Sequence, residues 1–202
     1  SSLVTGVQTC ALPISIKTWL NFIQNDDART KAELQSGQMI NTFPSRYVRI
    51  PVDKEVVLEK GIVDRKFADQ IVDEINLEIG TQVLYKNRLL MLDIIANNNW
   101  ERPIYFTGGS FGDDDYLWMK DYLKMEGIAY KLVPIKTPVD PRNPFDMGFV
   151  DTDKMYDIAM NWDWGSMGSD DIYHDPETRK NAITYRSNLA RLAENLDRKS
   201  VV

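Results

Sequence analysis

The sequence is poor in the residues that bind metal ions or form disulfides. One cysteine and one histidine occur among its 202 residues, too few to build a zinc or thiolate site. The chain also lacks an apolar run of the roughly 20 residues that a membrane-spanning helix needs. We therefore expect no cofactor and no metal ion, and no contact of this segment itself with a membrane.

The chain also has fewer basic than acidic residues. The chain carries 24 lysines and arginines against 30 aspartates and glutamates, which gives a net charge of -6. Nucleic acids and anionic membranes attract clustered positive charge, so we expect no nucleic acid as a partner. Hydrophobic residues make up 43% and aromatic residues 10% of the chain. These amounts indicate a folded chain with a buried core and argue against disorder.

The two ends of the chain do not fit the pattern of a fold. Residues 1–15 contain no charged residue and lack the positive n-region of a signal peptide. They resemble translated sequencing-adapter read-through at the edge of a metagenomic gene fragment, and residues 198–202 resemble the same artefact. We therefore expect residues 1–15 to be an artefactual or disordered leader, with Leu3, Val4 and Leu12 outside any core. Residues 198–202 are expected to be an artefactual tail.

The middle of the chain has the clearest pattern. Residues 87–96 predict an apolar helix that stops at three asparagines, and residues 103–107 predict a strand. Residues 113–126 predict a helix with an acidic first turn that ends at Gly127, and residues 128–135 predict a second strand. Strands that alternate with helices over short connections are typical of parallel pairing. We therefore expect the two strands to be parallel neighbours joined by a right-handed crossover.

Weaker patterns flank this unit. They predict helices over 16–25, 151–161 and 175–195, strands over 47–52 and 55–59, and an alternating segment over 76–85. The sequence as a whole predicts an α/β fold, with a small parallel or mixed sheet built from a βαβαβ unit, covering helices and a C-terminal helix. We divide it into an α/β domain over residues 16–150 and a helical C-terminal extension over residues 151–197.

A glycine-rich loop follows the strand at 103–107. Loops between a strand and a helix N-terminus often bind phosphates, which makes Gly108, Gly109, Ser110 and Gly112 candidate binding residues. The spacing is GGSFG rather than GxGxxG, no lysine follows, and three aspartates come next. A simple βα turn is the alternative.

Other candidates each have a structural alternative. Asp113–Asp115 with Asp121 could bind a cation, or they could cap a helix. Asp175 could orient the ring of His174, but no GxSxG motif supplies a nucleophile. Arg102 could hold a carboxylate or phosphate, or form a structural ion pair. Several aromatic residues could form a carbohydrate or peptide platform, or belong to the core: Tyr105, Tyr116, Trp118, Tyr122 and Tyr130.

Six runs of the sequence together resemble one protein family. They are DDARTK (26–31), FPSRYVRIPVDK (43–54), NNWERPIYF (98–106), DYLKMEGIAYKLVPI (121–135), DKMYD (153–157) and YRSNLARLA (185–193). The chain resembles the soluble, periplasmic C-terminal region of a bacterial family of multi-spanning membrane proteins. This family, formerly of unknown function, is grouped with protein O-mannosyltransferase-like glycosyltransferases.

The resemblance carries no catalytic residue over to this chain. In such enzymes the membrane portion handles a lipid-linked sugar donor, and the catalytic acid lies in an early extracytoplasmic loop. The chain matches a family signature that we expect to be structural: Trp100, Glu101, Arg102, Pro103, Tyr105, Glu126, Gly127 and Tyr130. Within it, we expect Trp100 to be buried against a helix and Arg102 to pair with an acidic neighbour. The last helix is expected to begin a tetratricopeptide-like hairpin, with its apolar face exposed.

Two functional hypotheses follow. The first is an extracytoplasmic, non-catalytic domain on the periplasmic side of the bacterial inner membrane, which positions acceptor or partner proteins. The partners that the resemblance implies are the chain's own upstream membrane domain and an acceptor protein or glycan. The second is a free-standing soluble enzyme that binds a sugar or nucleotide at the Gly108–Gly112 loop. A gene with about a dozen hydrophobic segments upstream of Ile16 would exclude the second hypothesis.

Overall fold

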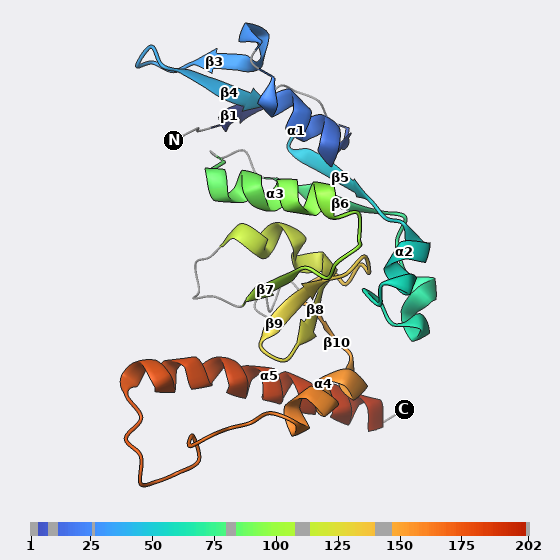
Figure 1. Cartoon of the computed structure of the whole chain (residues 1–202), viewed down its shortest axis with the longest axis vertical. Coiled ribbons are helices and arrows are strands. Elements are labelled where there is room, and N and C mark those ends of the chain that lie inside the picture. Colours follow the sequence, from blue (N-terminus) through green and yellow to red (C-terminus); the bar gives the residue numbers. More distant parts are fainter. Residues whose placement is uncertain are drawn as a thin grey trace. The chain divides into compact units, whose positions relative to one another are not determined.

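The chain forms two compact units. The computed structural model describes residues 4–7, 12–25, 27–79, 84–107, 114–139 and 147–200. The first unit comprises residues 1–104, 114–119 and 134–136, and the second comprises residues 105–113, 120–133 and 137–202 (Figure 1). Among the helices of the described ranges, none is long and apolar enough to cross a membrane.

The first unit contains two small mixed sheets. In one, β4 (Met39–Phe43) lies between β1 (Val4–Val7), which is parallel to it, and β3 (Lys31–Glu33), which is antiparallel. In the other, β5 (Tyr47–Pro51) lies between a parallel β2 (Ile14–Ser15) and an antiparallel β6 (Glu74–Glu78). The predicted strand over residues 47–52 is therefore confirmed.

The helical segments of this unit include α1 (Ile16–Gln24), η1 (Ala28–Thr30), α2 (Lys54–Glu59), η2 (Arg65–Gln70) and α3 (Lys86–Asn98). The predicted helices at 16–25 and 87–96 are confirmed as α1 and α3. Trp19 of α1 is fully buried, and its indole Nε1 donates a hydrogen bond to the Ser45 carbonyl at 2.7 Å. The other large side chains buried with it are Ile16, Phe43, Ile62, Ile75, Leu77, Ile79, Leu84, Leu92 and Met119.

The predicted strand over residues 55–59 is wrong, because this segment is helix α2. The Asp53 carboxylate accepts hydrogen bonds from the backbone N–H groups of Glu55 and Val56, both at 3.1 Å. An aspartate at this position satisfies N–H groups that the first helical turn leaves without partners. The cap therefore decides the local structure, against the β-branched residues that suggested a strand.

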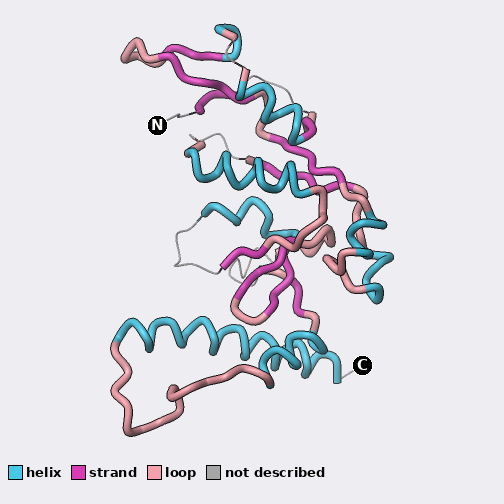
Figure 2. The backbone as a smooth tube through the Cα atoms, viewed as in Figure 1, coloured by secondary structure: helices cyan, strands magenta, loops and turns pink. Residues whose placement is uncertain are grey.

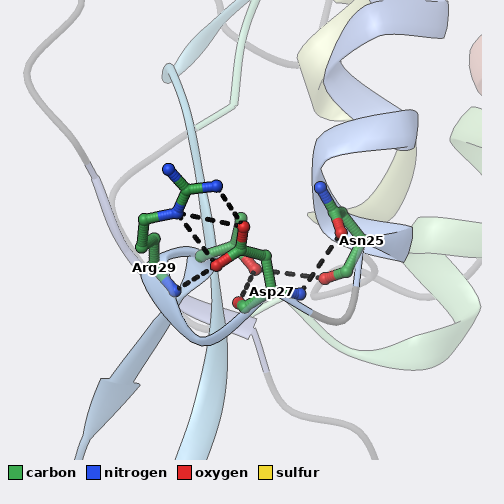
Figure 3. A network of polar contacts seen from close by, with 4 residues as sticks. Asn25, Asp27 and Arg29 are labelled. Carbon is green, nitrogen blue, oxygen red and sulfur yellow. Dashed lines mark hydrogen bonds and ion pairs between the residues drawn. The ribbon is translucent and has the colours of Figure 1, made fainter.

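A second aspartate cap lies in the DDARTK run (Figure 3). The Asp27 carboxylate accepts a hydrogen bond from the Arg29 backbone N–H at 2.9 Å and also binds the Arg29 guanidinium. The hydrogen bond from the Arg29 side chain is the larger cause that lowers the pKa of Asp27. Thr30 donates its hydroxyl to the Asp27 carbonyl at 2.7 Å. This run therefore builds a local turn before β3.

The second unit is built on a four-stranded sheet, whose strands are magenta in Figure 2. Its strand order is β10-β8-β9-β7, formed by β7 (Tyr105–Thr107), β8 (Leu123–Glu126), β9 (Ala129–Leu132) and β10 (Phe149–Val150). The 3-10 helix η3 (Asp114–Tyr122) precedes β8. Two helices follow the sheet in sequence, α4 (Thr152–Met160) and α5 (Pro176–Ser200). They confirm the predicted helices over 151–161 and 175–195.

The predicted parallel crossover is wrong, although the α/β fold with small mixed sheets and a C-terminal helix is confirmed. Strands β7 and β9 are neighbours, but they pair antiparallel. The predicted helix over 113–126 is instead η3 followed by β8, and β8 forms an antiparallel hairpin with β9. Gly127 opens the two-residue turn of this hairpin with a φ of +65°. A glycine with positive φ also follows many helix ends, so the same residue fits both structures.

The N-terminal segment is part of the described fold. Strands β1 and β2 pair with β4 and β5, so a disordered leader is wrong for residues 4–7 and 14–15. Leu12 is exposed, as expected, whereas Leu3 and the side chain of Val4 lie outside the described part of the chain. The interpretation of residues 1–15 as read-through concerns their origin and stays a prediction.

The division into units differs from the domain boundary that we expected after residue 150. Helices α4 and α5 belong to the same compact unit as the β8–β9 hairpin. Met155 of α4 and Leu192 of α5 pack with Met125 of β8 in one buried cluster. These two helices therefore complete the core of the second unit.

Candidate functional site

The glycine-rich loop is the first of the candidate sites. Gly108, Gly109, Ser110 and Gly112 lie outside the described residues, and their binding role stays a prediction. Asp113 and the side chains of residues 114 and 115 also lie outside them. The Asp121 carboxylate accepts a hydrogen bond from the Val139 backbone N–H at 3.3 Å. Within the described ranges, no group of three or more histidine, cysteine, aspartate or glutamate side chains is placed to hold a metal ion.

Asp175 caps helix α5. Its carboxylate accepts hydrogen bonds from the backbone N–H groups of Glu177 at 2.8 Å and Thr178 at 3.0 Å, and from the Thr178 hydroxyl at 3.0 Å. The hydrogen bond from the Thr178 backbone is the largest cause that lowers the pKa of Asp175. The carboxylate that could have oriented the ring of His174 therefore caps the helix.

The family signature is divided between the two units. Trp100 is buried in the first unit and donates its indole Nε1–H to the Pro51 carbonyl at 2.8 Å. Three signature residues that follow it are exposed: Glu101, Arg102 and Pro103. Among the residues that the structure describes, no ion pair involves Arg102, contrary to the acidic partner that we expected. The remaining signature residues, Tyr105, Glu126, Gly127 and Tyr130, gather in the second unit.

A row of polar side chains crosses one face of the second unit's sheet. Lys124 of β8 lies opposite Lys131 of β9, which in turn lies opposite Tyr105 of β7. Both lysines are buried, with 2% and 3% of their surface exposed. Two lysines directly opposite each other repel, so this arrangement needs negative charge nearby. We call Tyr105, Lys124, Glu126, Lys131 and Asp151 the charged row.

Glu126 is the centre of the charged row. Its carboxylate lies 3.2 Å from the Lys124 ammonium and 3.2 Å from that of Lys154, and it accepts a hydrogen bond from the Tyr105 hydroxyl at 2.8 Å. Lys124 also lies 3.5 Å from the Asp151 carboxylate. Burial raises the pKa of Glu126, but the Tyr105 hydroxyl and the lysines outweigh it, so the net pKa is below its ordinary value.

The pKa of Tyr105 is shifted in the opposite direction, upward. Burial, the hydrogen bond to Glu126 and the charge of that carboxylate together raise the pKa of Tyr105 to about 12. All three causes oppose a second negative charge beside Glu126. The hydroxyl is therefore a donor over the whole neutral range, and the charged row holds the edge strand β7 through it.

Replacing Tyr105 by phenylalanine tests the hydrogen bond to Glu126 through the pH dependence of stability. In the wild type, the stability that depends on the protonated hydroxyl is present below the ordinary pKa of 10.0 and is lost as pH rises toward about 12. We expect the variant to be less stable than the wild type by about 1 kcal/mol at neutral pH, since Tyr105 is half exposed. This difference should shrink between about pH 10 and about pH 12. Urea unfolding at several alkaline pH values measures it, and a constant difference would contradict the assignment.

The other face of the sheet packs against the helices. Met125, Met155 and Leu192 form its buried cluster, and the partly buried apolar residues against them are Tyr130, Val150, Ala159, Trp162 and Leu196. The Gly127 turn is fixed on both sides: its N–H donates to the Met155 Sδ at 3.2 Å, and its carbonyl accepts from Asn188 Nδ2 at 2.8 Å. Asn188 and Leu192 both belong to the YRSNLARLA run, which therefore holds the hairpin.

Replacing Gly127 by alanine should therefore lower the free energy of unfolding more than the same replacement at Gly61. Both glycines have a positive φ, +65° and +64°, which costs an alanine about 1 kcal/mol or more. An added Cβ at Gly127 lies 3.3 Å from Ile158 Cγ2, whereas nothing lies within 4 Å at Gly61. We expect the Gly127 variant to lose about 1 kcal/mol more than the Gly61 variant. Chemical denaturation measures both, and equal losses would contradict the tight packing of the turn.

An aromatic cluster joins the loop after α4 to helix α5. The ring centroids of Trp162 and Tyr185 lie 5.3 Å apart, those of Trp164 and Tyr185 lie 5.8 Å apart, and those of the two tryptophans lie 5.2 Å apart. All three pairs have the edge-to-face geometry that aromatic rings favour. This cluster fixes the loop against α5.

The loop and α5 enclose a cavity of about 330 Å³. We call it the aromatic pocket, and its lining residues are Trp164, Met167, Gly168, Ala182, Tyr185, Arg186 and Leu189. Trp164 and Met167 are each 40% exposed, so the pocket is open to solvent. Of these seven residues, none carries a carboxylate, imidazole or thiol. The pocket can therefore bind an apolar group, with Arg186 as its cationic side chain.

Sequence reasoning did not select the aromatic pocket as a site. Of its aromatic residues, only Tyr185 entered the sequence analysis, as the first residue of the YRSNLARLA run. The spacing on α5 was the available signal, because Ala182, Arg186 and Leu189 recur on one face of a helix. Of the aromatic residues considered as a platform, Trp118 belongs to the first unit, and Tyr105, Tyr122 and Tyr130 belong to the second.

The chain was compared with known proteins and families. The family model described as TMEM260-associated domain 2 matches residues 5–154. The matched residues include the whole charged row but end before the aromatic pocket. No curated protein and no solved structure matches the chain.

Proposed function

The chain belongs to the TMEM260-associated domain 2 family, and from this premise we propose that it is a non-catalytic domain which positions acceptor proteins. The parent in this proposal is a glycosyltransferase-like membrane protein, related to the O-mannosyltransferase-like protein TMEM260. The domain lies on the periplasmic side of the bacterial inner membrane. Its partners are its own membrane domain and the acceptor protein or glycan.

The aromatic pocket is the observation that supports this proposal. It is open, its walls are mostly apolar, and its one cationic side chain is Arg186. The carboxylates and lysines that the sheet gathers lie instead in the charged row, where Glu126 binds Tyr105 and two lysines. Acid–base catalysis needs a titratable group within reach of the substrate. An open apolar pocket is better suited to holding a polypeptide.

Two assays on the whole chain test the proposal. In the first, reduced and carboxymethylated α-lactalbumin serves as an extended acceptor, and titration calorimetry measures its binding. In the second, the chain is incubated with polyprenyl-phosphate mannose and the same polypeptide. We expect binding without release or transfer of mannose. Turnover of the donor by the chain alone would contradict a non-catalytic role and would favour an enzyme that uses the glycine-rich loop.

The gene of origin supplies an independent test. The proposal expects about a dozen hydrophobic segments upstream of Ile16 in the intact reading frame. A gene that encodes a free-standing protein without such segments would contradict the membrane-protein parent.

A further inference from the structure

Two arginines lie on the face of α5 that lines the aromatic pocket. Arg179, Ala182, Arg186 and Leu189 are spaced by three, four and three residues, so they share one face of the helix. Ala182, Arg186 and Leu189 line the pocket directly. Arg179 lies about two turns before Arg186 along this face, with its guanidinium 6.0 Å from the ring centroid of the exposed Tyr173.

Neither arginine is neutralised by a carboxylate in the described part of the chain. No ion pair within 4.0 Å joins Arg179 or Arg186 to an acidic side chain there. Lys180, in contrast, lies 3.9 Å from the Glu177 carboxylate, and the Asp163 carboxylate of the loop accepts a hydrogen bond from the Gly165 N–H. Arg179 and Arg186 thus supply two cationic groups on this helix face, while the loop before α5 carries the acidic residues Asp163, Asp170 and Asp171.

The aromatic pocket and the two arginines on its helix face together define one ligand chemistry. The cavity of about 330 Å³ is at the small end of ligand pockets, a size that suits one large apolar side chain. Met167 provides a flexible, polarizable wall that adapts to different side-chain shapes. A guanidinium binds a carboxylate through two parallel hydrogen bonds. We propose that the aromatic pocket takes an apolar side chain of an acidic polypeptide segment, whose carboxylates bind Arg179 and Arg186.

A sugar fits this surface less well. Sugar hydroxyls donate as well as accept hydrogen bonds, and the Tyr185 hydroxyl is the one strong side-chain acceptor among the seven lining residues of the pocket. The inference rests on the proposed function, because it names the kind of partner that the domain positions.

Three matched peptides test the inference on the whole chain by titration calorimetry. The first alternates leucine with aspartate and glutamate, the second has lysine at every acidic position, and the third has serine at every leucine. We expect the first to bind at least about tenfold more tightly than either of the others, a ratio that corresponds to about 1.4 kcal/mol. Its affinity should also fall as salt is raised, because salt screens exposed charges.

Variants of basic residues on α5 identify which of them bind the acidic peptide. Replacing Arg179 and Arg186 together by alanine should weaken binding of the acidic peptide about tenfold. The control Lys180→Ala, an exposed basic residue of the same helix, should leave the affinity within about twofold. Equal binding of the acidic and basic peptides, or a double arginine variant that binds as the wild type does, would overturn the inference.

The same experiment separates this inference from the proposed function. Carboxymethylated α-lactalbumin that binds without any preference for the acidic peptide would overturn the inference and leave acceptor positioning standing. No binding of any polypeptide would contradict both. The chain is also titrated with phosphatidylglycerol vesicles and with mannose oligosaccharides. Tighter binding of either than of the acidic peptide would overturn the inference and would identify a lipid or a glycan as the ligand.

Discussion

Replacing Glu126 by alanine is expected to lower the free energy of unfolding by about 3 kcal/mol. Glu126 is the carboxylate that both Lys124 and Lys154 approach within 3.2 Å. Lys124 is almost fully buried and lies opposite the buried Lys131. Removing the carboxylate leaves the buried ammonium groups of Lys124 and Lys131 with less negative charge nearby, and an unbalanced buried charge is costly.

Glu74→Ala is the matched control. Glu74 also forms an ion pair within a sheet, 3.6 Å from Arg49, but both side chains are more than 40% exposed. Exposed pairs contribute about 0–1 kcal/mol, so urea unfolding should separate the two variants clearly. Similar losses for the two variants would contradict the structural role of the charged row.

The effect of Glu126 also has a defined pH dependence. Because the folded-state pKa of Glu126 is lowered from 4.5, its stabilisation is present above that value and is lost as pH falls through the folded pKa. The difference between the wild type and Glu126→Ala should therefore shrink in acid. A difference that grows as pH falls would show that the carboxylate is strained rather than stabilised by its neighbours.

Replacing Met155 by alanine is expected to lower the free energy of unfolding by about 3 kcal/mol. Met155 is fully buried at the centre of the cluster that joins α4, α5 and the sheet. The change leaves a cavity, and it also removes the sulfur that accepts the Gly127 N–H at 3.2 Å. An unsatisfied N–H in the tight turn adds to the cost of the cavity.

Met160→Ala provides the control on the same helix. Met160 is 66% exposed, so its replacement should change stability by less than about 0.5 kcal/mol. Thermal or urea unfolding of the two variants compares the same substitution at a buried and an exposed position. A small effect at Met155 would mean that α4 and α5 do not complete the core of the second unit.

Helices α1, α3 and α5 were predictable because each has a local signal. Apolar spacing defines α1, the run of three asparagines ends α3, and Asp175 with Pro176 starts α5. The hairpin of β8 and β9 was not predictable in this way. Its strands are short, and the glycine at its turn is also typical of a helix end. The contacts that hold its turn come from α4 and α5, far along the chain, where a local pattern does not reach.

Local sequence patterns also did not predict the charged row or the aromatic pocket. The resemblance to a family selected Tyr105, Glu126, Gly127 and Tyr130, but their assembly depends on the register of three strands. The aromatic pocket depends on a loop that folds back onto α5 through rings of Trp162, Trp164 and Tyr185. Periodicity places residues on one face of one element, and it does not say which loop covers that face.

The central claim is that the aromatic pocket holds a polypeptide, and a pair of variants tests it most directly. Trp164→Ala removes an aromatic wall of the pocket, whereas Tyr156→Ala removes an exposed aromatic residue of α4 that does not line it. Binding of carboxymethylated α-lactalbumin to each variant is measured by titration calorimetry, after urea unfolding has shown that both are folded. We predict that Trp164→Ala weakens binding at least about tenfold and Tyr156→Ala less than about twofold. Equal affinities for the two folded variants would contradict the claim.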